Sequence, residues 1–71
     1  MIEEVTRSWA LVLERGVEPD QHLFEELGAE SVKVLELLDV MSERFGVFLT
    51  VEQLYENPTP RAVAILVEQS V

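Results

Sequence analysis

Apolar residues recur along this chain at intervals of three and four positions, the spacing that places side chains on one face of an α-helix. Near the start, five apolar residues share such a face: Ile2, Val5, Trp9, Val12 and Leu13. Glu3 and Glu4 suit the positive end of a helix dipole, and Gly16 suits the end of the helix. The pattern predicts a helix over residues 3–15, with Trp9 in the core.

The strongest helical pattern runs from Ser31 to about Phe45, and Gly46 is expected to end that helix. Its core-facing stripe consists of Val34, Leu37, Leu38, Met41 and Phe45. The opposite face carries Val32, Glu36, Asp39 and Glu43. This second face is acidic and is expected to face solvent, with one apolar residue at its N-terminal end. Serine is a favoured N-cap residue, so capping by itself would account for Ser31.

Two further helices are predicted from their caps. Thr50 with Gln53 fits a capping box at the start of a short helix over residues 51–56, which Asn57 and Pro58 end. Thr59 suits the N-cap of a last helix and Pro60 its first position, where the missing N–H costs nothing. The apolar face of this helix consists of Val63, Leu66 and Val67.

Residues 16–30 form a long connection between the first two main helices. Pro19 and Gly28 interrupt regular structure there. Four apolar residues are expected to pin the connection across the core: Val17, Leu23, Phe24 and Leu27. We therefore predict an all-α fold, a small antiparallel four-helix bundle of three main helices and one short one, in a single domain over residues 1–71.

Composition excludes several classes of function. The chain has 14 acidic and five basic residues, a net charge of −9, which disfavours binding to nucleic acid or to anionic membranes. It contains no cysteine and one histidine, so a disulfide framework or a thiolate metal site is excluded. The sequence shows neither a signal peptide nor an apolar run long enough for a membrane span. We expect a cytoplasmic monomer.

An enzyme is not expected. Nucleophilic catalysis needs a nucleophile, a base and an orienting group, and that set is hard to build with one histidine, one lysine and no cysteine. The single histidine, His22, lies in the long connection, where a solvated or locally hydrogen-bonded side chain is the expected state. A chain of 71 residues also has little room for a pocket that excludes water.

Ser31 stands out because it follows an apolar-pinned loop and opens the best helix, at a positive helix end that suits a phosphate ester. The stretch Leu27-Gly28-Ala29-Glu30-Ser31-Val32 resembles the Leu-Gly-x-Asp-Ser-Leu motif of acyl and peptidyl carrier proteins. Residues 43–47 resemble the end of the second helix of that family. Residues 54–60, followed by 63–64, are similar to the late segment of carriers from polyketide and nonribosomal peptide synthesis.

The resemblance implies that Ser31 is a substrate, to which a phosphopantetheinyl transferase attaches 4′-phosphopantetheine from coenzyme A. The thiol of that arm would hold acyl or aminoacyl groups as thioesters and deliver them to loading and to condensing or tailoring enzymes of a secondary-metabolic pathway. Glu30 stands where the family usually has Asp, and Val32 is smaller than the usual Leu. Both departures leave the attachment residue in place.

The resemblance also implies that the second helix meets partner enzymes. The residues expected at such a surface are Glu30, Val32, Lys33, Glu36, Phe48, Val51 and Tyr55. Val51 and Tyr55 would flank the path of the arm, whereas core packing accounts for Leu54. The alternative is an acidic helical adaptor that binds a partner through the same helix face without any covalent group. Modification at Ser31 distinguishes the two.

Overall fold

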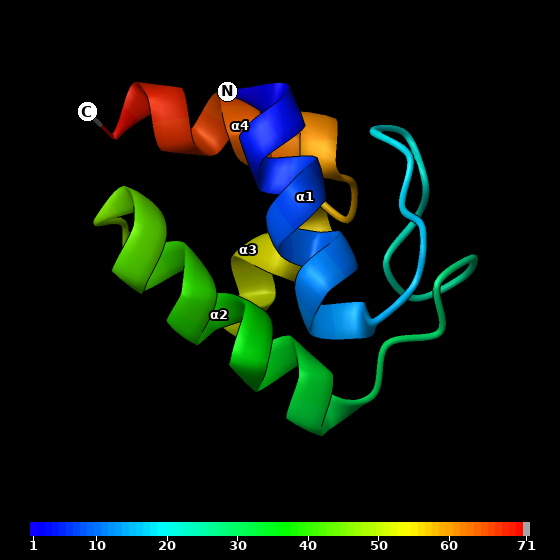
Figure 1. Ribbon diagram of the computed structural model, residues 1–71. Helices are drawn as coiled ribbons and strands as arrows, with labels where there is room; N and C mark the ends of the chain where they lie inside the picture. The colour runs from blue at the N-terminus through cyan, green and yellow to red at the C-terminus, as the bar shows by residue number, and fades with distance from the viewer. Residues whose placement is uncertain (71) are drawn as a thin grey trace.

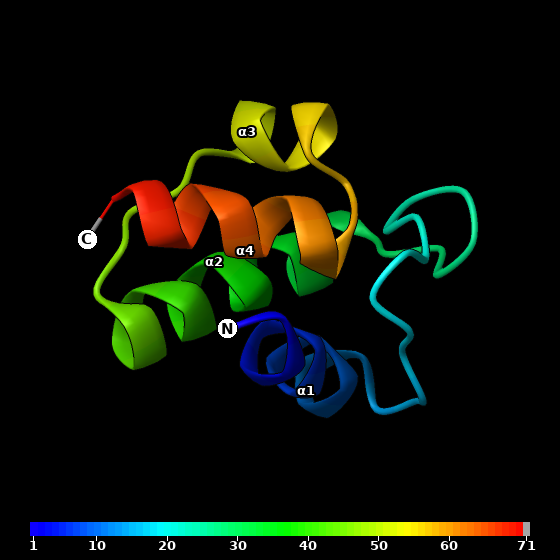
Figure 2. The same cartoon turned by 90° about the horizontal axis from the view of Figure 1, so that it is seen from above.

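The computed structural model describes residues 1–70, which form four α-helices (Figure 1). They are α1 (Ile2–Leu13), α2 (Ser31–Phe45), α3 (Val51–Glu56) and α4 (Pro60–Gln69). Helix α1 packs against both α2 and α4, while the short α3 contacts α2. The long connection between α1 and α2 extends from one end of the bundle (Figure 2). The predicted all-α, four-helix fold is confirmed.

One hydrophobic core joins the helices and the long loop. Its buried members are Val5, Trp9, Val12, Leu23, Leu27, Val34, Leu37, Met41, Val47, Leu54, Val63, Ala64 and Val67. Leu38, Phe45 and Ile2 pack on this cluster at its edge and are partly exposed. Trp9 is fully buried as predicted, although its indole N–H meets no acceptor among residues 1–70.

Helix ends follow local sequence, with one exception. The predicted bounds of α2 and α3 are confirmed, and Pro60 opens α4. Helix α1 instead spans Ile2–Leu13, so the end predicted at Gly16 is wrong. Glu14 takes the left-handed conformation at φ 55°, and the Arg15 N–H donates to the Ala10 carbonyl at 3.3 Å. A non-glycine residue therefore carries the backbone strain of this helix end.

The caps of the two C-terminal helices are those the sequence predicts. Thr50 Oγ1 accepts from the Gln53 N–H at 3.1 Å, and Gln53 Oε1 accepts from the Thr50 N–H at 2.9 Å. These two hydrogen bonds complete the capping box of α3. Thr59 Oγ1 accepts from the Ala62 N–H at 3.1 Å and caps α4.

The N-cap of α2 is Glu30, which corrects the interpretation of Ser31 as a capping residue. Glu30 has an extended backbone, and its side chain forms no capping hydrogen bond. Ser31 occupies the first helical position instead, one residue beyond the place from which a side chain can cap the helix. Capping therefore does not explain a serine at position 31.

The loop of residues 14–30 is anchored at both the core and α4. Leu23 and Leu27 are buried, and Val17 and Phe24 pack on the core at its edge, as predicted. The Leu23 N–H donates to the Pro58 carbonyl at 2.7 Å. These contacts hold the loop beside the α3–α4 junction.

None of the helices in residues 1–70 is long and apolar enough to cross a lipid bilayer. Within the same residues, no cluster of three or more histidine or acidic side chains could hold a metal ion.

Candidate functional site

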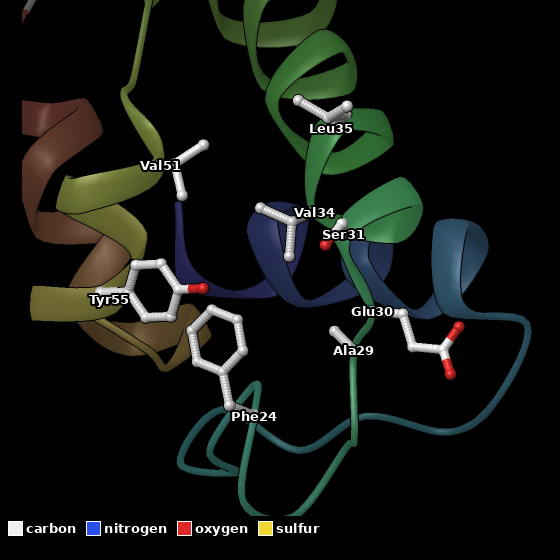
Figure 3. Close-up of a pocket in the computed structure, with 8 residues that line it drawn as sticks. All are labelled: Phe24, Ala29, Glu30, Ser31, Val34, Leu35, Val51 and Tyr55. Atoms are coloured by element: carbon white, nitrogen blue, oxygen red, sulfur yellow. The ribbon is translucent and has the colours of Figure 1, made fainter.

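Ser31 opens α2 and faces solvent beside a groove of about 430 Å³ (Figure 3). Its hydroxyl forms no hydrogen bond with any described residue, because it lies outside the capping position. Three elements line this Ser31 groove: the loop with Phe24, Ala29 and Glu30, α2 with Ser31, Val34 and Leu35, and α3 with Val51 and Tyr55. An unengaged hydroxyl thus lies at the edge of a mostly apolar hollow.

An aromatic pair forms the wall of the groove opposite α2. The rings of Phe24 and Tyr55 are stacked, with centroids 4.5 Å apart and an angle of 16° between their planes. Figure 3 shows the two rings side by side, Phe24 from the loop and Tyr55 from α3. Offset stacking of this kind contributes about 0.5–1.5 kcal/mol beyond the buried area. The pair joins the loop to α3 along this wall.

His22 organises the turn that carries Phe24. Its Nδ1 accepts hydrogen bonds from the Phe24 N–H at 3.1 Å and the Glu25 N–H at 3.0 Å. Glu26 Oε1 accepts from the His22 N–H at 3.0 Å, so side chain and backbone cap each other reciprocally. The sequence-based expectation of a locally hydrogen-bonded histidine is confirmed.

The residues predicted to meet partners fall into three groups. Glu30, Val51 and Tyr55 line the groove with Ser31. Val32, Lys33 and Glu36 lie on the first turns of α2, outside the groove lining. Phe48 lies in the α2–α3 connection, outside the groove lining, and is 87% exposed. Leu54 is fully buried, as core packing required.

The acidic face of α2 keeps an excess of negative charge around Ser31. Lys33 Nζ lies 3.4 Å from Glu36 Oε2 and 3.9 Å from Glu14 Oε2, so its charge is shared between two carboxylates. Glu30 is exposed and has no ion pair among the described residues. A protein surface that meets this end of α2 would therefore gain from carrying positive charge.

Leu35 was not among the predicted site residues, yet it lines the groove and is 57% exposed. One signal could have found it: Leu35 lies four residues after Ser31, so both belong to one face of α2. No comparable signal marks Phe24 as a groove residue, because a loop has no periodicity. The place of Phe24 against Tyr55 depends on the tertiary path of the loop.

The arrangement fits a phosphate ester on Ser31. The hydroxyl is exposed, it stands at the N-terminal end of a helix of 15 residues, and the Glu30 side chain leaves the first-turn N–H groups uncapped. Helix N-termini favour negatively charged groups for this reason. Ser31 would hold the group covalently, and the Ser31 groove offers an apolar surface beside it.

Two of the known proteins that are similar to this chain come from polyketide or nonribosomal peptide systems. The hybrid PKS-NRPS synthetase pynA of Aspergillus niger is 31% identical over 61 residues, which cover 86% of this chain and only 2% of that protein. The second, solved in solution, is a non-covalent extended docking domain complex of the Pax NRPS, PaxA T1-CDD/PaxB NDD. It superposes with a TM-score of 0.81 at 25% identity over 96% of this chain and 65% of that one.

A family model described as the phosphopantetheine attachment site matches residues 3–67, nearly the whole chain. Members of this family carry 4′-phosphopantetheine as a covalently attached cofactor. The match, the four-helix fold and the exposed serine motif agree, and the chain belongs to the phosphopantetheine-binding carrier protein family.

Proposed function

We propose that this chain is a carrier domain that bears 4′-phosphopantetheine on Ser31 and works in polyketide or nonribosomal peptide biosynthesis. Bound there, the arm supplies a thiol that holds acyl or aminoacyl groups as thioesters. The observation that carries the proposal is the unengaged Ser31 hydroxyl at the mouth of the groove. The two similar proteins, a PKS-NRPS synthetase and an NRPS complex, support the class of pathway.

Five of the other serine and threonine hydroxyls have structural roles. Of the six other serine and threonine side chains, Thr6, Ser8 and Ser70 donate to helix carbonyls, and Thr50 and Thr59 cap helices. Ser42 is the remaining one, and it lies in the C-terminal half of α2, outside the groove lining. Ser31 is therefore the hydroxyl best placed for modification.

The chain would act as a substrate in the modification step. Ser31 Oγ would bond to the phosphorus next to the pantetheine of coenzyme A, while the diphosphate bond breaks and adenosine bisphosphate leaves. The proton of the hydroxyl must go to a base. No side chain among the described residues is hydrogen-bonded to Ser31 Oγ, so the phosphopantetheinyl transferase would supply that base.

The partner surface would surround Ser31. Val32 and Leu35 on α2, with Tyr55 on α3, are more than half exposed and offer apolar contacts. Glu30 and Glu36 add negative charge, and Phe48 would extend the surface along the α2–α3 connection. Weak contacts of this kind favour fast exchange between partners, since charge complementarity raises association rates more than affinity. We further propose a monomeric single domain, which the one shared core supports.

The test is the intact mass of the chain before and after incubation with coenzyme A and a broad-specificity phosphopantetheinyl transferase. We expect the native chain to gain one phosphopantetheine and Ser31→Ala to gain none. Ser42→Ala is the matched control, because it removes the other serine hydroxyl of α2 and should leave the gain intact. A gain by Ser31→Ala, or none by the folded native chain with two different transferases, would refute the proposal and favour the unmodified adaptor.

A further inference from the structure

His22 is held in one tautomer by the turn that precedes Ser31. Its Nδ1 accepts from two backbone N–H groups, those of Phe24 and Glu25. A ring nitrogen that accepts cannot carry a proton, so the hydrogen of the neutral ring is assigned to Nε2. Nε2 lies 3.0 Å from Glu25 Oε2. Both ring nitrogens therefore face groups of the turn.

The turn capped by His22 positions Phe24, which forms part of the wall of the Ser31 groove. Phe24 follows His22 by two residues, and its ring lies edge-on to the imidazole at a centroid distance of 6.1 Å. The same ring stacks on Tyr55 at 4.5 Å. Leu23, between the two, is fully buried and donates to the Pro58 carbonyl. The His22 hydrogen bonds thus hold the residue that forms half of the aromatic wall.

We propose that His22 is a positioning residue for the Ser31 groove: its neutral imidazole caps the turn that holds Phe24 against Tyr55, and its protonation releases Phe24. A protonated Nδ1 is a donor, so it would face the Phe24 and Glu25 N–H groups with no acceptor between them. The imidazolium must then leave the turn, and both N–H groups lose their partner. The link to Ser31 rests on the proposed function, whereas the release of Phe24 does not.

The titratable side chains around His22 ordinarily change charge at other pH values, so their effects can be distinguished from protonation of His22. Two titratable side chains contact His22: Glu25 lies beside Nε2, and Glu26 accepts from the backbone N–H. Tyr55 of α3 lies behind the Phe24 ring. Glutamate ordinarily titrates near pH 4.3 and tyrosine near pH 10, while histidine changes charge between about pH 5 and pH 8. The His22 variants show whether a change within the latter range depends on this ring.

The test is solution NMR of the native chain between about pH 8 and about pH 5. The His22 ring resonances report its protonation, and cross-relaxation between the Phe24 and Tyr55 rings reports the stack. We expect ring contacts to weaken as His22 becomes charged. We expect the exchange protection of the Phe24 and Glu25 amides, corrected for intrinsic pH dependence, to fall by about tenfold, the equivalent of about 1.4 kcal/mol.

Two substitutions make the test specific. His22→Asn places an amide oxygen where Nδ1 was, since both atoms are bonded to Cγ, and this oxygen accepts without titrating. We expect His22→Asn to keep the ring contacts and the protection across the whole range. His22→Ala has no acceptor and should show weak contacts and low protection already at about pH 8. Amides of α4 serve as the internal control, and their protection should stay constant in all three chains.

Three results would overturn the proposal: ring contacts that persist after His22 has titrated, a ring that stays neutral down to about pH 5, or a response of His22→Asn equal to that of the native chain. The consequence for Ser31 is measured separately, as kcat/KM of phosphopantetheinyl transfer at about pH 8. We expect a severalfold loss in His22→Ala and none in His22→Asn. If no chain is modified at all, the proposed function fails while the NMR result stands.

Discussion

Asp20 and Arg61, 41 residues apart in sequence, form a bidentate ion pair between the long loop and the first turn of α4. Arg61 Nε donates to Asp20 Oδ1 at 2.7 Å, and Arg61 Nη2 donates to Asp20 Oδ2 at 3.1 Å. The Arg61 N–H also donates to the Pro19 carbonyl at 3.0 Å. The pair is exposed, but its geometry is the one in which arginine binds carboxylate best.

The Asp20–Arg61 pair should make stability depend on pH. The side-chain hydrogen bond from Arg61 holds the pKa of the Asp20 carboxyl below its ordinary value of 3.8. A carboxyl whose pKa is lower in the folded chain stabilises it above the unfolded pKa and loses that effect as pH falls through the folded pKa. We expect Asp20→Asn to lower the free energy of unfolding slightly at neutral pH and not at all in strong acid, as measured by urea denaturation.

A second loop carboxylate provides the control for that measurement. Glu18 has no ion pair among the described residues, so Glu18→Gln should leave the free energy of unfolding unchanged at both pH values. Equal losses for Asp20→Asn at neutral and acidic pH would contradict the role of the charge.

Replacing Ser31 should cost almost no stability, because its hydroxyl forms no hydrogen bond within residues 1–70. We expect Ser31→Ala to change the free energy of unfolding by less than about 0.5 kcal/mol. Thr50→Ala is the contrast, since Thr50 caps α3, and its loss should cost about 1 kcal/mol. Denaturation of the unmodified chains in urea compares them. A loss of similar size in both would mean that Ser31 has a capping role after all.

Glu14 is a site where a glycine should stabilise the chain. Its φ of 55° is strained for any residue with a Cβ atom. We expect Glu14→Gly to raise the free energy of unfolding by about 0.5–1 kcal/mol. Glu14→Ala is the matched control, because it removes the carboxylate near Lys33 but keeps the Cβ, and it should bring no gain. Thermal or urea unfolding measures both, and an equal gain from alanine would locate the effect in the charge.

Val51 and Leu54 lie on one short helix, and their replacement by alanine should affect the free energy of unfolding very differently. Leu54 is fully buried, so Leu54→Ala should cost about 2–5 kcal/mol, enough to unfold much of a domain this small. Val51 is 37% exposed and lines the Ser31 groove, so Val51→Ala should cost less than about 1 kcal/mol.

Circular dichroism in urea measures the stability of the Val51 and Leu54 variants. The rate of phosphopantetheinyl transfer measures the groove, and Val51→Ala should lower it while the chain stays folded. Unchanged transfer in that variant would remove Val51 from the functional surface.

Local sequence determined most of the secondary structure. The capping box of Thr50 with Gln53, the Thr59 cap and Pro60 act within one helical turn, so the starts of α3 and α4 follow from residues next to each other. The helix stripes predicted the core for the same reason, since burial follows the 3.6-residue period. The motif around Ser31 likewise pointed to the family without any tertiary information.

Tertiary structure decided what surrounds Ser31. The stack of Phe24 on Tyr55, the Asp20–Arg61 pair and the path of the long loop join residues far apart in sequence, and no period or short-range rule links them. The sequence suggested Ser31 as the capping residue of α2, but Ser31 is the first helical residue, a difference of one position. This difference depends on the extended backbone of Glu30, which the anchored loop positions at the start of α2. Long-range packing, and not local propensity, placed an unengaged hydroxyl beside an apolar groove.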